Sequence, residues 1–126
     1  MTDRRILVVD DEEHLREVVQ ACLEDLGGWE TQVAASGEEC LQILQTEQPS
    51  AILLDVSMPG MDGIAVYDRL QSDPITRSIP VILLTAKVLP GDRAKFAKMG
   101  VAGVISKPIQ PITLTEEVAE ILGWVE

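Results

Sequence analysis

Aromatic residues are scarce in this sequence: they occupy 3% of its 126 positions, although 46% of the residues are hydrophobic. The core must therefore be built from aliphatic side chains. Cysteine is also scarce, since only Cys22 and Cys40 are present and they do not form a C-x-x-C pair. We therefore expect two reduced core thiols rather than a redox pair or a zinc site.

Basic residues are outnumbered, with 10 lysines and arginines against 21 acidic residues and a formal net charge of −11. Such a surface repels nucleic-acid phosphates and anionic membranes, so direct binding to either is not expected. It suits a divalent cation or a partner with a basic face. The sequence also has no apolar run long enough to span a bilayer and no visible signal peptide after Met1, which predicts a cytoplasmic protein.

Short aliphatic runs alternate with segments of helical periodicity along the whole chain. The apolar runs predict strands at residues 6–9, 29–35, 51–54, 80–84 and 102–106. Helical spacing predicts five helices, including one at about 88–99 and a last one that begins near Thr113. This order predicts an α/β fold in which five helices flank a doubly wound, five-stranded parallel sheet, within one domain that spans residues 1–126.

Several residues are typical of helix ends. Ser36 and Glu39 have the spacing of a capping box, and Thr113 and Glu116 have the same spacing. Gly100 is expected to end the helix at 88–99. Asp11 could cap the first helix in addition to a role at a binding site.

Polar residues follow the predicted strands at their carboxyl ends. Asp10 and Asp11 follow the first strand, Asp55 the third, Thr85 the fourth and Lys107 the fifth. Ligands of open parallel α/β sheets bind outside these ends of the strands, where the strand order reverses. We therefore expect three carboxylates, one hydroxyl and one ammonium to meet in one cleft.

Three neighbouring carboxylates need more compensation than one lysine can give. A hard dication with oxygen ligands can supply it, and magnesium binds in this way, through carboxylates, waters and phosphate oxygens. Asp55 stands alone at a central strand end and is the better candidate for a nucleophile, because aspartate can form an acyl phosphate. Lys107 and Thr85 could then stabilise the charge on a transferred phosphoryl group.

Four motifs together resemble the receiver domain of bacterial two-component response regulators, most closely the single-domain type related to chemotaxis regulators. They cover the chain in order and are Val8-Val9-Asp10-Asp11-Glu12, Leu54-Asp55-Val56-Ser57-Met58-Pro59-Gly60-Met61-Asp62-Gly63, Leu84-Thr85-Ala86 and Ser106-Lys107-Pro108. The resemblance implies a flavodoxin-like sheet with strand order 2-1-3-4-5. It also implies a regulatory domain that promotes only its own phosphorylation and dephosphorylation, and is otherwise not an enzyme.

The resemblance implies a role for each matching residue. Asp55 would accept a phosphoryl group from a phosphohistidine of a sensor histidine kinase or a histidine phosphotransfer protein. The magnesium ligands would be Asp10, Asp11, Asp55 and the backbone carbonyl of Ser57. Lys107 would pair with the phosphoryl group.

The resemblance also implies a cis peptide bond between Lys107 and Pro108. Thr85 would move toward the phosphoryl group, and in the family an aromatic residue of the fifth strand follows it. Val104 stands at that position here, so the aromatic switch cannot operate in its usual form. Ser57 and Lys87 match positions that tune the lifetime of the acyl phosphate.

The output surface would be the face formed by the helix at 88–99, the strand at 102–106 and the last helix, where an unidentified downstream protein would dock. The domain would be a monomer or a phosphorylation-dependent dimer. One alternative is a receiver segment of a hybrid kinase or of a larger regulator.

Two other functions fit less well. A phosphatase of the haloacid-dehalogenase type needs a second aspartate where this chain has Ser57. A flavin or nucleotide module needs a glycine-rich phosphate loop after the first strand, but an acidic segment at residues 10–13 stands there.

Overall fold

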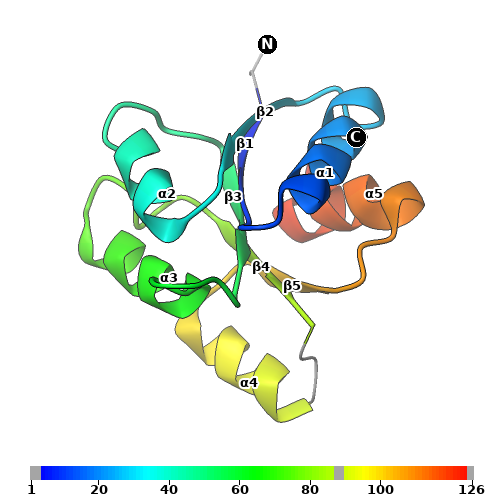
Figure 1. Cartoon of the computed structure of the whole chain (residues 1–126). Helices are drawn as coiled ribbons and strands as arrows, with labels where there is room; N and C mark the ends of the chain where they lie inside the picture. The colour runs from blue at the N-terminus through cyan, green and yellow to red at the C-terminus, as the bar shows by residue number, and fades with distance from the viewer. Residues whose placement is uncertain (1–3, 87–89, 125–126) are drawn as a thin grey trace.

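The computed structural model describes residues 4–86 and 90–124, in which strands and helices alternate (Figure 1). The strands are β1 (Arg5–Val9), β2 (Glu30–Ala34), β3 (Ala51–Asp55), β4 (Val81–Thr85) and β5 (Gly103–Ser106). The helices are α1 (Glu13–Asp25), α2 (Gly37–Ile43), α3 (Gly63–Ser72), α4 (Pro90–Met99) and α5 (Pro111–Leu122). No helix in the described ranges is long and apolar enough to cross a membrane.

The strands form one sheet in the order β2-β1-β3-β4-β5, and every neighbouring pair is parallel. The predicted flavodoxin-like fold is therefore confirmed. The chain moves outward from β1 to β2, returns to β3 on the other side of β1, and continues to β4 and β5. The order reverses between β1 and β3, so their carboxyl ends open onto the crevice where such sheets bind ligands.

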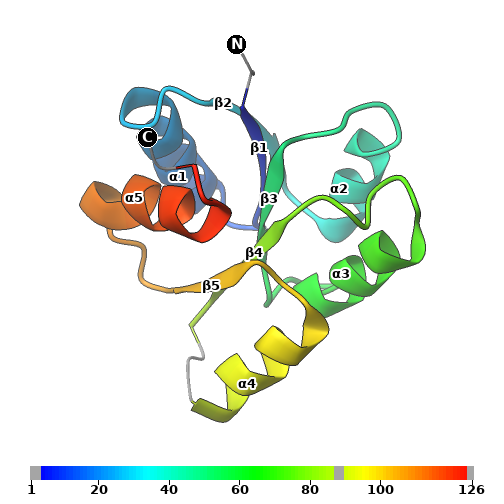
Figure 2. The same ribbon diagram turned by 180° about the vertical axis from the view of Figure 1, so that it is seen from behind.

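Helices cover both faces of the sheet, as the two opposite views show (Figures 1 and 2). One face packs against α1 and α5, and the other against α2, α3 and α4. The residues of β1, β3 and β4 are almost entirely buried, which explains why these strands consist of continuous aliphatic runs. A sheet packed on both sides leaves the strand ends as the places where polar side chains can reach solvent.

Helix ends match the sequence in some places and differ in others. Ser36 accepts a hydrogen bond from the Glu39 amide at 3.1 Å, which is one half of a capping box, while the Glu39 carboxylate accepts from the Ala35 amide at 3.1 Å and not from the Ser36 amide. Gly100 follows α4 with a φ of 94°, the left-handed conformation that glycine adopts most easily. The prediction for α5 was wrong: this helix begins at Pro111, whose fixed φ suits a first helical position and whose missing N–H costs nothing there.

The remaining cap predictions were also wrong. The hydroxyl of Thr113 lies 3.2 Å from a Glu117 carboxylate oxygen, one turn further along α5, and makes no capping box with Glu116. Glu12, and not Asp11, stands at the N-cap of α1, and its side chain makes no capping hydrogen bond.

Candidate functional site

The ends of four adjacent strands bring the predicted site residues together. Asp10 directly follows β1, Asp55 ends β3 and Thr85 ends β4. Lys107 follows β5, and its backbone amide donates to the Thr85 carbonyl at 2.9 Å. Asp10, Asp55 and Thr85 are buried, although each is polar.

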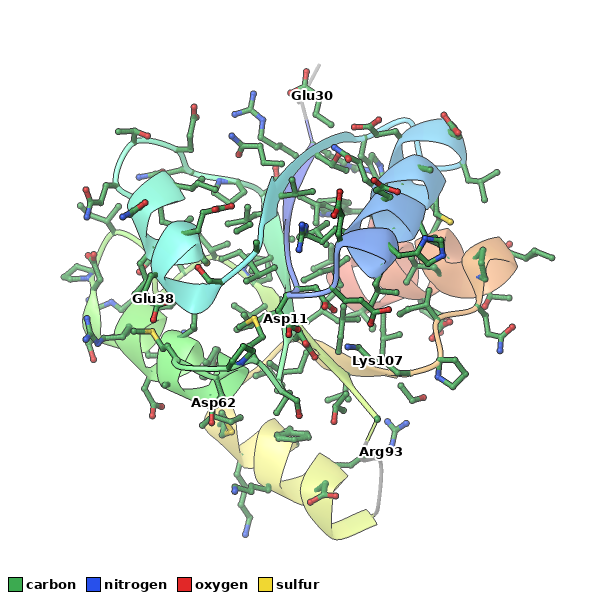
Figure 3. All side chains as sticks on the ribbon, viewed as in Figure 1. Asp11, Glu30, Glu38, Asp62, Arg93 and Lys107 are labelled. Carbon is green, nitrogen blue, oxygen red and sulfur yellow. The ribbon has the colours of Figure 1, made fainter. Side chains whose placement is uncertain are left out.

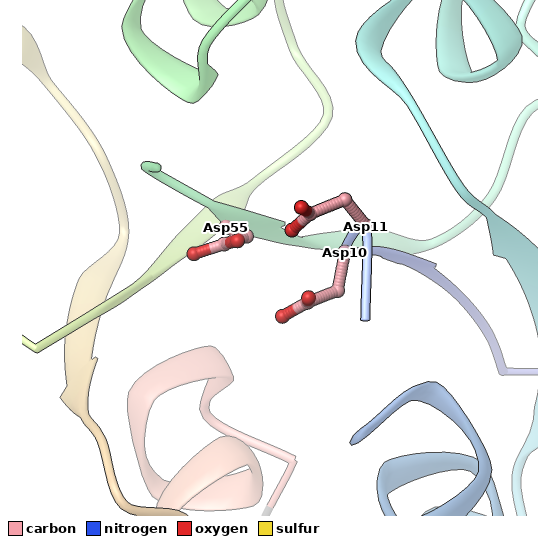
Figure 4. Close-up of side chains that lie close together, drawn as sticks. All are labelled: Asp10, Asp11 and Asp55. Carbon is pink, nitrogen blue, oxygen red and sulfur yellow. The ribbon is translucent and has the colours of Figure 1, made fainter. Parts of the chain in front are cut away.

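The three carboxylates face a common space (Figure 4). Asp10, Asp11 and Asp55 each offer an oxygen, and these oxygens lie within 4.8 Å of one another. Asp10 and Asp55 are 0% and 2% exposed, whereas Asp11 is exposed. The cluster therefore has two buried acids at its base and one at its mouth.

Lys107 joins the two buried acids. Its Nζ lies 3.0 Å from Asp55 Oδ1 and 3.2 Å from Asp10 Oδ2. Figure 3 shows Lys107 reaching in from the segment after β5, while Asp11 comes from the segment after β1. One ammonium thus bridges two carboxylates that are 97 and 52 residues away in the sequence.

Burial and charge shift the protonation of the pair. Burial raises the pKa of Asp55, and the nearby Asp10 carboxylate raises it further, while the hydrogen bond from Lys107 works in the opposite direction. Burial alone would lower the pKa of Lys107, but its hydrogen bond to Asp55 and the charges of both acids outweigh that effect and raise it. Lys107 therefore stays protonated at neutral pH, while burial disfavours the ionised form of Asp55 and the hydrogen bond from Lys107 favours it.

The donor set fits a divalent metal ion. Three carboxylates and one ammonium leave about two negative charges uncompensated in a largely buried space. Carboxylate oxygens are hard ligands of the kind that magnesium binds. Ser57 lies beside the cluster, since its amide is 3.4 Å from Asp55 Oδ1.

The other predicted site residues lie at different depths. The Lys107–Pro108 peptide bond is cis, the geometry that the resemblance implied. Val104 is partly buried and packs against the core on the α2–α3–α4 side. Lys87 lies outside the described residues.

Two residues near the site have a structural role that the sequence did not indicate. An Arg16 guanidinium nitrogen donates to the Asp10 carbonyl at 2.7 Å. Gly63 starts α3 directly against the end of β3, where a Cβ would collide with the Asp55 carbonyl and lie 2.8 Å from the Val56 Cα. The motif contained this glycine, but only the packing of α3 on the strand end explains why no larger residue fits there.

The sequence matches the response regulator receiver domain family over residues 6–119. The chain belongs to this family. Receiver domains of this kind take part in two-component phosphorelay signalling as regulatory modules, and they interact with histidine kinases or phosphotransfer proteins.

Curated relatives share the domain and extend beyond it. Response regulator Rre1 of Synechocystis sp. is 38% identical over 118 residues, which are 94% of this chain and 51% of Rre1. Response regulator PleD of Caulobacter vibrioides is 40% identical over 117 residues, which are 93% of this chain and 26% of PleD. The chain thus spans about half the length of the first relative and about a quarter of the second.

Solved structures match the chain over nearly its whole length. Chemotaxis response regulator CheY4 of Vibrio cholerae superposes with a TM-score of 0.88 at 29% identity, covering 95% of this chain and 99% of CheY4. The receiver domain of the sensor histidine kinase PA1611 from Pseudomonas aeruginosa matches with a TM-score of 0.83 at 27% identity, covering 97% of this chain and 99% of that domain. That structure has a magnesium ion coordinated in its active-site cleft.

Proposed function

We propose that Asp55 is the phosphoacceptor of this receiver domain. The supporting observation is the placement of Lys107, whose ammonium contacts Asp55 and Asp10 at 3.0 and 3.2 Å while Asp11 completes the acidic cluster. A nucleophilic carboxylate, a fixed cation and further oxygen ligands are the parts that phosphoryl transfer to an aspartate needs.

The phosphodonor is a phosphohistidine of a sensor histidine kinase or of a phosphotransfer protein. A carboxylate oxygen of Asp55 forms a bond to phosphorus as the bond between phosphorus and the imidazole nitrogen breaks, and the imidazole leaves with the electron pair. Lys107 balances charge on the phosphoryl oxygens, and the Thr85 hydroxyl donates to one of them. Hydrolysis of the acyl phosphate by water later resets the domain.

The residues that would hold magnesium are Asp10, Asp11, Asp55 and the backbone carbonyl of Ser57. What a magnesium ion supplies when bound is positive charge opposite the carboxylates and the phosphoryl oxygens. Ser57 lies beside Asp55, where its side chain would affect the lifetime of the acyl phosphate by shaping the access of water, and Lys87 is proposed for the same role.

The signal leaves through a protein–protein surface formed by α4, β5 and α5. Phosphorylation adds up to about two negative charges beside Thr85, and the Thr85 hydroxyl would move toward the phosphoryl group. On the described part of this face, Ile112 is 84% exposed, whereas Ile105 is buried. A downstream protein, or a second phosphorylated copy of the chain, would dock there.

The proposal is tested by intact mass after incubation with acetyl phosphate and magnesium chloride. We expect one added phosphoryl group, which Asp55→Asn abolishes. Asp62→Asn is the matched control: Asp62 is an exposed aspartate of the same loop that caps α3, and asparagine caps a helix as well as aspartate does. Phosphorylation that persists in Asp55→Asn, or that is lost in Asp62→Asn, would assign the acceptor elsewhere.

A further inference from the structure

Asp11 is the acid of the cluster that is held least firmly by its neighbours. Its carboxylate is exposed, and within residues 4–86 and 90–124 no donor makes a hydrogen bond to it. Asp10, in contrast, has three polar contacts. Its amide donates to the Ala34 carbonyl, one carboxylate oxygen accepts from the Glu12 amide at 2.9 Å, and the other contacts Lys107. The direction of Asp11 therefore depends on its backbone.

Arg16 holds that backbone. Its Nη1 donates to the Asp10 carbonyl at 2.7 Å, a short distance typical of a charge-assisted hydrogen bond. This carbonyl belongs to the peptide unit between Asp10 and Asp11, and a peptide unit is planar from one Cα to the next. A bond to its oxygen therefore fixes the plane from which the Asp11 side chain projects.

The position of Arg16 is unusual for an arginine. It lies near the amino end of α1, where the helix dipole disfavours a positive charge. The chain has 21 acidic residues, yet no carboxylate of a described residue lies within ion-pair distance of the Arg16 guanidinium. The guanidinium instead donates a hydrogen bond to a neutral carbonyl next to the acidic cluster.

We infer that Arg16 is a positioning residue for the metal site: it orients the peptide plane between Asp10 and Asp11 so that the Asp11 carboxylate faces a bound magnesium ion. This inference rests on the proposed function, because it assumes that Asp11 is a ligand. Groups that orient metal ligands through hydrogen bonds typically change metal affinity by about 10- to 100-fold when they are removed.

The sign of the effect separates positioning from simple electrostatics. Arg16 carries a positive charge near a site for a cation, so removing the charge should tighten magnesium binding if charge alone matters. Removing an orienting hydrogen bond should weaken it. Arg16→Gln removes the charge and shortens the donor, and we expect the magnesium dissociation constant to rise about tenfold despite the lost repulsion.

Magnesium chloride is titrated into the full chain by calorimetry at constant ionic strength, in the absence of any phosphodonor. Arg16→Lys keeps the charge and a donor, so it should lose less affinity than Arg16→Gln. Arg77→Gln is the matched control: Arg77 is exposed and precedes β4, at the opposite end of the sheet from the site. We expect the control to bind magnesium as the wild type does.

A local signal separates positioning from general loss of structure. The Asp11 amide shares its peptide unit with the carbonyl that Arg16 holds, so its ¹⁵N chemical shift should change in Arg16→Gln while the core amides of β3 and β4 keep their shifts. Unchanged or tighter magnesium binding in a folded Arg16→Gln variant, or a larger loss of affinity in Arg16→Lys than in Arg16→Gln, would overturn the inference. No magnesium binding by the wild type would instead refute the proposed function.

Discussion

Replacing the proposed phosphoacceptor should make the metal-free protein more stable. In Asp55→Asn a buried carboxylate becomes a neutral amide of nearly the same shape. Lys107 keeps a partner, because its Nζ also lies 3.2 Å from Asp10. The variant therefore removes a charge from the cluster and still leaves the Lys107 ammonium with one carboxylate partner.

The magnitude follows from the distances. At an effective dielectric constant of about 20, an ammonium 3.0 Å away attracts the Asp55 carboxylate by about 5.5 kcal/mol. Asp10, whose ligand oxygen lies within 4.8 Å, repels it by at least about 3.5 kcal/mol, and the exposed Asp11 adds a smaller, solvent-screened repulsion. These Coulomb energies nearly cancel, and the cost of removing the carboxylate from water remains.

We therefore expect Asp55→Asn to raise the free energy of unfolding by about 1–3 kcal/mol, since the buried amide recovers only part of the desolvation cost. For a domain of this size the melting temperature should rise by about 4–12 °C. The assay is thermal unfolding followed by circular dichroism at neutral pH with a chelator present. Asp62→Asn, on the exposed cap of α3, should change the melting temperature little.

The pH dependence has a defined sign. Burial, the largest cause, raises the pKa of Asp55 above its ordinary value of 3.8, so folding favours the protonated acid. That contribution to stability is fully present below pH 3.8 and is lost as the pH rises through the folded-state pKa. The advantage of Asp55→Asn should thus be large at neutral pH and vanish in acid. An equal or lower melting temperature at neutral pH would refute this account of the cluster.

Two further predictions concern the packing. Gly63→Ala should lower the free energy of unfolding, measured in urea, by about 3 kcal/mol or more, because its Cβ would collide with the end of β3. Gly91 in α4 has open space around it, so the free energy of unfolding of the control Gly91→Ala should stay within about 1 kcal/mol of that of the wild type. Burial raises the pKa of Cys40 to about 12, so its thiol should not react with iodoacetamide at pH 8 in the folded protein. It should react after the protein is unfolded in urea. Rapid alkylation of Cys40 in the folded protein would contradict this.

The sequence predicted the sheet and the position of the site for one physical reason. Continuous aliphatic runs must be covered on both faces, and polar residues at their ends then gather at one edge of a parallel sheet. Asp10, Asp55 and Lys107 are far apart in the chain, yet the strand order alone brings them together. Their roles in chemistry, which both the residue types and the motifs suggest, stay proposals.

Other features depend on geometry that residue patterns do not carry. The contact between Arg16 and the Asp10 carbonyl requires a side chain to fold back over the start of α1, which no periodicity indicates. The capping-box pattern of Thr113 and Glu116 predicts a start of α5 near Thr113, while Pro111 is an equally local signal for a start two residues earlier. Competing cap residues a few positions apart cannot be ranked without the packing of the helix.

Because β5 carries no aromatic side chain, the proposed switch cannot use a ring in that strand. Val104 packs against the same core face as Tyr67 of α3 and Phe96 of α4, the chain's one tyrosine and one phenylalanine. The Tyr67 hydroxyl donates to the carbonyl of Met99, the last residue of α4, at 3.0 Å. The side chains of β5 therefore include no ring that could move. The hydrogen bond of Tyr67 instead links α3, which begins directly after the site loop, to the end of α4, where Phe96 packs in the same core cluster. Since packed interiors shift between discrete arrangements rather than deform smoothly, a displacement of either helix must repack these rings.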